Sequence, residues 1–428
     1  MKLWDKGFDT HQKIEKFTVG NDRILDLKLA KFDVIGSMTH AEMLAKIGIL
    51  KQAELKEIIS GLATIAENIE NDSFTIENDF EDVHSKIEFE LTAMIGDAAK
   101  KIHTARSRND QVLVALHLYI KDEIMKIKAL METLFNTLIG LSEKYQTVLM
   151  PGYTHFQIAM PSSFGLWFSA YAENLIDDVI MLNAAFKIAD QNPLGSAAGY
   201  GSSYPIDRQM TTDLLGFETL KYNVIAAQMS RGKLEKTLSF ALSSLALTLS
   251  KFAMDICLNN SQNFKFISFP NELTTGSSIM PHKKNPDVFE LIRANCNRIQ
   301  ALPTQISMIT TNLPSGYHRD FQILKEEIMN SIDLMKDNLE IFNFMISKIE
   351  INTTILFDPI YDSLYSVEEV NKLVMQGISF REAYKKVAHD IASGDYSPDK
   401  ILKHTHIGSI GNLCLDKIKD KFDKYNKL

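Results

Sequence analysis

The sequence predicts an all-α protein of three units built around a long central helix bundle. Three apolar stripes indicate the bundle, because their members recur at steps of three and four residues, the spacing of one helix face. They run through positions 113–141, 164–186 and 234–256. Stripes of this length are typical of extended bundle helices. Strand signals are sparse. A chain of 428 residues is longer than a single hydrophobic core usually supports, so several units are expected.

Helix breakers suggest how the chain is divided. Pro151-Gly152 is expected to end the first long helix, and the small polar residues of 192–203 and 271–284 predict two loops. Shorter helices are expected after about residue 352. We therefore expect an N-terminal helical domain at 1–106, a bundle and oligomerisation domain at 107–352, and a small C-terminal helical domain at 353–428.

Charge and cysteine content argue against several classes of function. A net charge of -8 argues against a nucleic-acid surface, which needs a clustered basic face. Three widely spaced cysteines make neither a disulfide framework nor a zinc set. The start of the chain lacks the apolar core of a signal peptide, and no apolar run approaches the roughly 20 residues that span a bilayer. We expect a cytoplasmic protein with no membrane, nucleic-acid or metal partner.

The sequence GSSIMPHKKNP at 276–286 combines groups suited to charge stabilisation. Gly276 allows unusual backbone angles, and the hydroxyl of Ser277 could join backbone donors in an anion-binding concavity. Lys283 adds a positive charge and Asn285 an amide, while Pro286 suits the first residue of the next helix. The alternative is a flexible loop that only caps that helix. The whole motif favours a functional loop.

This loop resembles the signature of the fumarase/aspartase superfamily. That superfamily includes fumarases, aspartases, adenylosuccinate lyases, argininosuccinate lyases and delta-crystallins. The resemblance implies an all-helical fold, a homotetramer, and active sites built from three subunits. The apolar stripes agree with these implications, since exposed apolar bundle surface would be buried by self-association.

A second motif, HTARSRNDQ at 103–111, precedes the first long helix. Arginine binds carboxylates through two parallel hydrogen bonds, so this cluster suits a carboxylate-bearing ligand. The alternative is a solvated helix start capped by a serine or asparagine. The motif resembles a segment specific to argininosuccinate lyases, which implies that Ser107, Arg108 and Asn109 bind substrate. Ala105 stands where the family has glycine.

A third motif, PGYTHFQ at 151–157, holds a histidine that could carry a proton near neutral pH. A lone histidine is more often structural. The motif is similar to the GYTHLQ segment of argininosuccinate lyases, which implies that His155 is an active-site histidine and Thr154 a substrate contact. The same resemblance pairs His155 with Glu290. Ile158 and Met160 depart from the family's polar residues.

Further matches cover most of the chain. The segment YHRDFQILK at 317–325 resembles a family segment in which Tyr317, Gln322 and Lys325 would bind substrate. Arg231 resembles an arginine near the family's active site, and GISFREAY at 377–384 resembles a C-terminal family segment. The N-terminal substrate-binding serine of the family would fall near Asp22, with Thr18 a weaker candidate.

The resemblance implies cleavage of argininosuccinate to L-arginine and fumarate by β-elimination, with no metal or organic cofactor. Ser277, as an alkoxide, would remove the proton, supported by Lys283 and Asn285. His155, tuned by Glu290, would protonate the departing guanidino nitrogen. The alternatives are an adenylosuccinate lyase or fumarase-type member, or a non-catalytic crystallin-like homologue. A metal site at His404 and His406 is less expected than a solvated tail.

Overall fold

In the computed structural model, residues 11–427 are described, and the chain forms two compact units. The start of the chain, on which the expectation about a signal peptide depends, lies outside the described residues. Each unit draws on three chain segments: unit 1 is 1–127, 181–243 and 299–335, and unit 2 is 128–180, 244–298 and 336–428. The three-domain division expected from the sequence stays a prediction.

Unit 1 contains the N-terminal helices. Their common core is apolar and includes Val34, Leu44, Ile58, Leu62 and Leu91. Helix α5 begins at Val83 because the Asp82 carboxylate accepts a hydrogen bond from the Ser85 amide at 2.8 Å. The helices are α1 (Gln12–Val19), α2 (Asp22–Leu25), α3 (Ala30–Lys46), α4 (Gln52–Glu70), α5 (Val83–Ile95) and α6 (Asp97–Lys100), with 3-10 turns η1 (Asp26–Leu29) and η2 (Lys101–His103).

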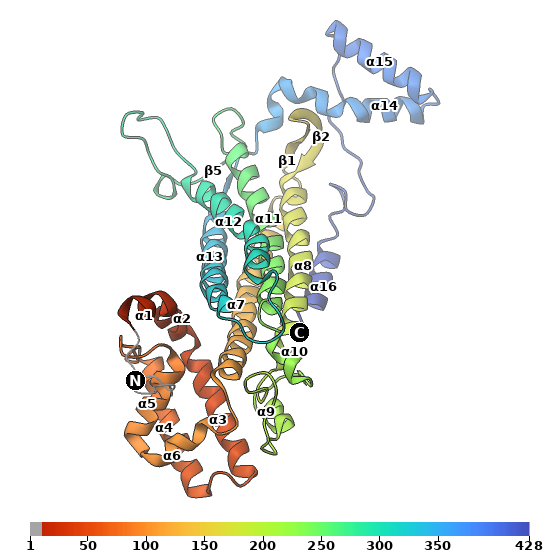
Figure 1. The fold of residues 1–428 in the computed structure, drawn as a ribbon. Coiled ribbons are helices and arrows are strands. Elements are labelled where there is room, and N and C mark those ends of the chain that lie inside the picture. Colours follow the sequence, from red (N-terminus) through yellow and green to blue (C-terminus); the bar gives the residue numbers. More distant parts are fainter. Residues whose placement is uncertain (1–10, 428) are drawn as a thin grey trace. The chain divides into compact units, whose positions relative to one another are not determined.

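The long helices that the apolar stripes predict are confirmed (Figure 1). Of the predicted stripe positions, all but Leu141 and Phe186 are buried. Their burial follows from the 3.6-residue period, which places every third or fourth side chain on one face. The helices with predicted stripes are α7 (Arg108–Lys144), α8 (Phe164–Ala189) and α11 (Lys233–Asn259). Two further long helices, for which no stripe was predicted, are α12 (Asp287–Thr310) and α13 (Ile323–Ile346).

The prediction that Pro151-Gly152 ends the first long helix is wrong. Helix α7 ends at Lys144, and these two residues lie in strand β1 (Leu149–Thr154), which pairs antiparallel with β2 (Gln157–Ser163). The register shifts between Pro151 and Tyr153, which is where a proline without an N–H interrupts a ladder. Two shorter pairs are β3 (Gln191–Asn192) with β4 (Thr219–Leu220), and β5 (Ile267–Ser268) with β6 (Glu350–Ile351).

The remaining elements are short, as predicted after residue 352. In unit 2, the last helix packs by stacking the Phe422 ring on Phe135, with centroids 3.9 Å apart. These elements are α9 (Arg208–Leu214), α10 (Val224–Gln228), η3 (Asn271–Leu273), η4 (Arg319–Gln322), η5 (Ile355–Phe357), η6 (Pro359–Tyr365), α14 (Ser366–Met375), α15 (Phe380–Ser393) and α16 (Leu415–Asn426).

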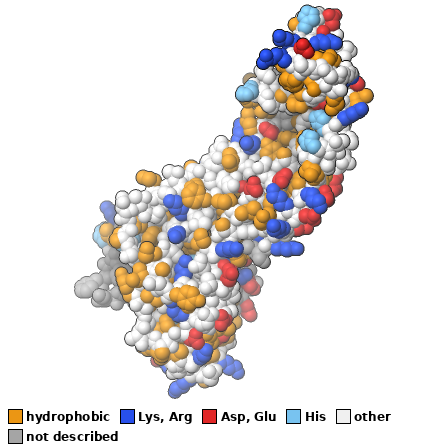
Figure 2. All heavy atoms as spheres, turned by 90° about the vertical axis from the view of Figure 1, so that its right-hand side faces the viewer, with side chains coloured by type: hydrophobic (Ala, Val, Ile, Leu, Met, Phe, Trp, Pro, Cys, Tyr) orange, Lys and Arg blue, Asp and Glu red, His pale blue; other side chains and the backbone are white. Residues whose placement is uncertain are grey.

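Helix α11 is the one helix in 11–427 whose length and apolar composition would allow it to cross a membrane. Such a test is also passed by core helices of soluble proteins, and the predicted stripe of α11 is buried throughout. We therefore interpret α11 as a core helix of the bundle. Figure 2 shows acidic and basic side chains interspersed with apolar ones on one face of the protein.

Candidate active site

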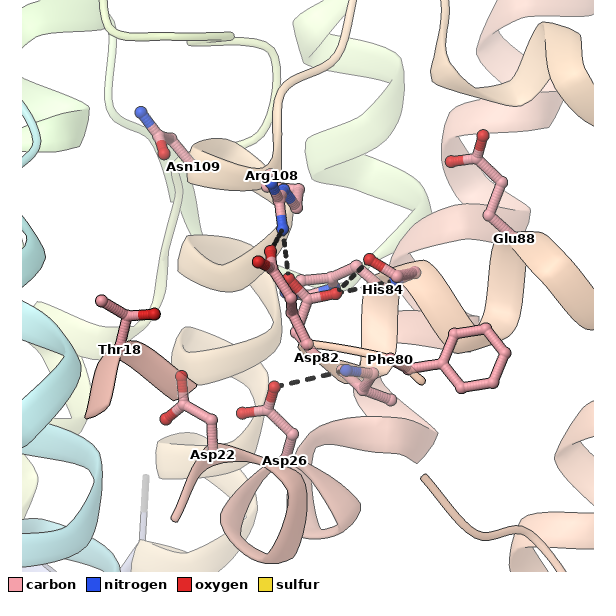
Figure 3. Close-up of polar contacts among 12 residues, drawn as sticks. Thr18, Asp22, Asp26, Phe80, Asp82, His84, Glu88, Arg108 and Asn109 are labelled. Carbon is pink, nitrogen blue, oxygen red and sulfur yellow. Dashed lines mark hydrogen bonds and ion pairs between the residues drawn. The ribbon is translucent and has the colours of Figure 1, made fainter. Parts of the chain in front are cut away.

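Arg108, the first residue of α7, is held by two carboxylates from the segment before α5. Its Nη1 lies 2.7 Å from an Asp82 oxygen and 3.1 Å from a Glu81 oxygen (Figure 3). Burial would raise the pKa of Asp82, but the charges of His84 and Arg108 outweigh it and hold that pKa at about 2. The predicted carboxylate-binding cation is thus already paired within unit 1.

Lys325 lies in a similar acidic environment. Its Nζ is 2.8 Å from Asp22 Oδ1 and 2.7 Å from Asp26 Oδ1. Burial lowers the pKa of Lys325, but the two carboxylates raise it more, so the ammonium stays charged. Burial also raises the pKa of Asp22 to about 6, although Lys325 opposes that shift. Asp22, near which we expected the family's serine to fall, therefore binds a residue predicted to bind substrate.

Gln322 and Arg231 also contact the chain itself. The Gln322 amide donates to the Thr18 and Val19 carbonyls at 2.8 and 3.1 Å. The buried Arg231 guanidinium donates to Glu235 at 2.9 Å and to the Phe321 carbonyl at 2.5 Å. Arg231 thus holds the segment that carries Gln322.

Ser107 and Asn109, which flank Arg108 at the start of α7, add further polar side chains. The Ser107 hydroxyl accepts a hydrogen bond from the Asn109 amide at 3.2 Å, the usual contact of a helix-capping serine. Figure 3 shows the Asn109 side chain beside Arg108, on the side where Thr18 and Asp22 lie. Tyr317 packs edge-on against Phe321, with ring centroids 6.2 Å apart. Unit 1 therefore collects most of the predicted substrate-binding residues.

The 276–286 loop, which we call the signature loop, lies in unit 2. Thr275 and Asn285 close its base through backbone hydrogen bonds of 3.4 and 2.8 Å. The Asn285 amide donates to the Gly276 carbonyl at 3.3 Å. The Ser277 hydroxyl oxygen accepts the Met280 amide at 3.1 Å and the Ile279 amide at 3.4 Å. Two backbone dipoles thus point at the predicted base, as stabilisation of an alkoxide requires.

The cation of the signature loop is not ion-paired. Lys283 is exposed, and its ammonium makes no ion pair within residues 11–427. Its backbone amide donates to the Met280 carbonyl at 3.1 Å. Helix α12 follows at Asp287, one residue after Pro286, and Glu290 lies exposed in its first turn. The loop therefore presents an available positive charge near the serine.

His155 lies at the tip of the β1–β2 hairpin, not in the helix-boundary loop expected from the sequence. Thr154 pairs with Gln157, so His155 and Phe156 form a two-residue turn, with φ of 54° and 56°. Few residues with a Cβ take this left-handed conformation, although histidine does so more readily than a bulky residue such as phenylalanine. Backbone of this kind often marks functional sites. His155 lines a cavity of about 550 Å³ with Asp255 and Trp167.

The structure distributes the predicted residues over both units. The proposed base, cation, acid and carboxylate partner all lie in unit 2, but in the described part of the chain no hydrogen bond or ion pair joins His155 to Glu290. No group of three or more histidine, cysteine or acidic side chains suited to a metal occurs among the residues described. Sequence reasoning missed Asp26 and Asp110, which accept hydrogen bonds from Lys325 and Ala197, 299 and 87 positions away along the chain.

The chain was compared with known protein families and curated proteins. A family model described as "Lyase" matches residues 9–301. The chain is 56% identical over 417 residues to the argininosuccinate lyase of Bacteroides fragilis, covering 97% of this chain and 93% of that protein. It is 42% identical over 387 residues to the argininosuccinate lyase of Thermotoga neapolitana, covering 90% and 97%.

Solved structures confirm the predicted all-α, fumarase/aspartase-like fold. An EDDS lyase variant with bound fumarate matches with a TM-score of 0.74 at 23% identity, covering 98% of this chain and 86% of that chain. Fumarate lyase:delta crystallin from Brucella melitensis, bound to cobalt, matches with a TM-score of 0.76 at 17% identity, covering 97% and 94%. Fold, family model and near full-length identity agree, and the chain belongs to the argininosuccinate lyase family.

Proposed function

We propose that this protein cleaves argininosuccinate to L-arginine and fumarate by β-elimination. The observation that carries the proposal is the hydrogen bonding of Ser277, whose hydroxyl oxygen accepts two backbone N–H groups. The same loop carries the Lys283 ammonium, which makes no ion pair within residues 11–427. The two curated relatives described above are named argininosuccinate lyases, which supports the choice of substrate.

The reaction begins with removal of a proton from the succinyl carbon beside a carboxylate. Ser277, as an alkoxide, takes this proton, and the carbanion spreads its charge into the carboxylate. Lys283, Asn285 and loop amides stabilise both negative charges. One well-placed donor is worth about 3–4 kcal/mol, while enzymatic accelerations require at least roughly 8 kcal/mol, so several donors must act together.

The C–N bond then breaks, and the leaving guanidino nitrogen takes a proton. We assign this proton to His155, with Glu290 as the carboxylate that favours its charged form. Because no hydrogen bond joins these two residues within the described chain, the assignment requires a group from another subunit or a loop movement. A closing signature loop would also exclude water from the alkoxide.

The remaining predicted residues would bind the substrate. Ser107, Arg108, Asn109 and Thr154 would contact it from the helix start and the hairpin, and Arg231, Tyr317, Gln322 and Lys325 from the segments of unit 1. The carboxylates beside Arg108 and Lys325 favour binding of the cationic end of the substrate there.

The working form would be a cytoplasmic homotetramer whose active sites are shared between subunits. Phe240, Leu247 and Met254 support this proposal, because they are 48%, 55% and 38% exposed and follow one another by seven positions on α11. A seven-residue apolar repeat is the pattern of a helix-pairing seam. Active sites shared between subunits would also explain why no hydrogen bond joins His155 to Glu290 within the described residues of one chain.

The test is fumarate release from argininosuccinate by the wild type and by Ser277→Ala. We expect turnover by the wild type and a loss of at least about a thousandfold in Ser277→Ala, because the base and its electrostatic support act only together. Ser278→Ala is the matched control and should retain turnover. Near-normal activity of Ser277→Ala would refute the base, and cleavage of adenylosuccinate alone would refute the substrate.

A further inference from the structure

The loop 195–201, between β3 and α9, has a backbone with four positive φ angles, three at glycines and one at an alanine. Gly195, Gly199 and Gly201 have φ of 86°, 103° and 80°, and Ala197, a residue with a Cβ, has φ of 51°. Gly199 and Gly201 both donate to the Ser196 carbonyl, at 2.9 and 3.2 Å. A left-handed alanine persists only where surrounding contacts fix it.

Two buried side chains, from helices α7 and α10, supply those contacts. Asp110, in the first turn of α7, is fully buried; one carboxylate oxygen accepts the Ala197 and Gly195 amides at 2.9 and 3.2 Å. Its other oxygen accepts the Ser107 amide at 2.8 Å. Gln228, at the end of α10 and also fully buried, donates to the Ser196 hydroxyl at 3.0 Å and the Ala197 carbonyl at 3.1 Å.

The fixed backbone presents an exposed side chain at its tip. Tyr200 is 72% exposed although its neighbour Gly199 is buried. Its hydroxyl lies 3.9 Å from the point where a Cβ on Gly316 would be, so it reaches the turn just before Tyr317. Asp110 therefore links the start of the loop to the segment that carries Ser107. The tip of the loop, at Tyr200, lies beside the turn that precedes Tyr317.

We propose that loop 195–201 forms a further wall of the substrate site, with Tyr200 as a specificity-determining contact and Gln228 and Asp110 as positioning residues. This inference rests on the proposed function, because it takes the segments of Ser107 and Tyr317 as substrate-binding. The Tyr200 hydroxyl would hydrogen-bond a charged group of the substrate in the ground state and transition state alike. Asp110 and Gln228 hold the loop backbone in its strained conformation, and this backbone fixes the position of the Tyr200 hydroxyl.

The first test compares Tyr200→Phe with wild type in steady-state kinetics. Loss of a hydrogen bond to a charged group should raise KM about tenfold and leave kcat within about twofold, because the contact is the same in both states. Tyr200→Ala should raise KM at least as much. Tyr222→Phe, a change at another exposed tyrosine outside the loop, is the matched control and should leave KM unchanged. An unchanged KM in both Tyr200 variants overturns the contact.

The positioning role is tested by a double-mutant cycle. Gln228→Met removes both hydrogen bonds to the loop with little change of volume. As a single substitution, Gln228→Met should raise KM. In the Tyr200→Phe background the further rise in KM should be much smaller, because Gln228 acts through Tyr200. A merely structural defect would give additive effects and lower kcat, which would overturn this role.

Failure of this inference can be distinguished from failure of the proposed function. Argininosuccinate and adenylosuccinate are both offered to the wild type, and the variants are compared on whichever one it cleaves. A wild type active only on adenylosuccinate refutes the proposed substrate. An active wild type with unaltered Tyr200 variants refutes the loop proposal alone.

Discussion

At the residue scale, two cations of the candidate site, Arg108 and Lys325, are already paired with carboxylates of the same chain. Arg108 contacts Asp82 and Glu81, and Lys325 contacts Asp22 and Asp26. Such pairs hold long side chains at fixed positions, which reduces the entropy lost when a ligand binds. They also leave unit 1 with surplus negative charge around these two cations.

Asp22 should make stability depend on pH. Burial raises its folded pKa from 3.8 to about 6, so the folded protein takes up a proton before the unfolded chain does. The stability from this proton is present at low pH and lost as pH rises through about 6. Asp22→Asn cannot take up the proton. In urea unfolding, wild type should therefore gain stability relative to Asp22→Asn as pH falls from about 7 to about 4. A constant difference would contradict the shift.

Ala105 has a strained backbone conformation that glycine would adopt without strain. Its φ is 60°, and the left-handed conformation costs a residue with a Cβ roughly 1–2 kcal/mol. A glycine at this position would lower the free energy of unfolding by about 0.4–1 kcal/mol relative to alanine, because it gives the unfolded chain more conformational freedom. Ala105→Gly should therefore raise the free energy of unfolding by about 0.5–1 kcal/mol, as measured by urea titration.

Ala93→Gly provides the matched control for Ala105→Gly. Ala93 is exposed in the helix α5, where glycine should lower the free energy of unfolding by about 1 kcal/mol. If both variants lose stability equally, the strain at Ala105 is not present.

The sequence predicted Arg108 and Lys325 as substrate-binding residues, but it did not predict the carboxylates with which they pair. Arg108 lies within a motif whose residues are adjacent in the chain, so its type and position are visible there. Asp26 and Lys325 are 299 positions apart, and nothing local in the sequence joins them. The same holds for Asp110 and Ala197, which are 87 positions apart.

At the scale of elements, the helices were predictable and the hairpin was not. The stripes of α7, α8 and α11 repeat over many turns, so local periodicity alone identifies them. The hairpin turn consists of His155 and Phe156, whereas two-residue turns usually contain Asn-Gly or Asp-Gly. The neighbouring proline and glycine instead suggested a loop, so tertiary contacts must determine this element.

The last helix should contribute strongly to the stability of unit 2. Phe422 is buried and stacks on Phe135, so Phe422→Ala leaves a cavity and should lower the free energy of unfolding by about 3–5 kcal/mol. Lys417→Ala, at an exposed position of the same helix, should change it by less than about 0.5 kcal/mol. Thermal or urea unfolding checks both variants, and a small loss in Phe422→Ala would mean that α16 is not docked.

At the scale of the whole molecule, the exposed apolar seam of α11 should decide assembly. Leu247→Glu places a charge in this seam and should convert the proposed homotetramer to smaller species, with loss of fumarate release if active sites are shared. Sedimentation velocity measures the assembly. Leu247→Met keeps the seam apolar and should assemble as wild type does. An intact tetramer in Leu247→Glu would exclude this seam as an interface.

The division of the chain has a consequence for its folding. Each compact unit is assembled from three separate segments, of which the last begins at residue 299 in unit 1 and at residue 336 in unit 2. Contacts between segments distant in sequence require large loops to close, which slows folding. Neither unit can therefore be completed from the first half of a growing chain on the ribosome. The exposed stripes of unfinished helices would meanwhile be available to chaperones or to aggregation, so synthesis of this protein should be unusually sensitive to premature termination.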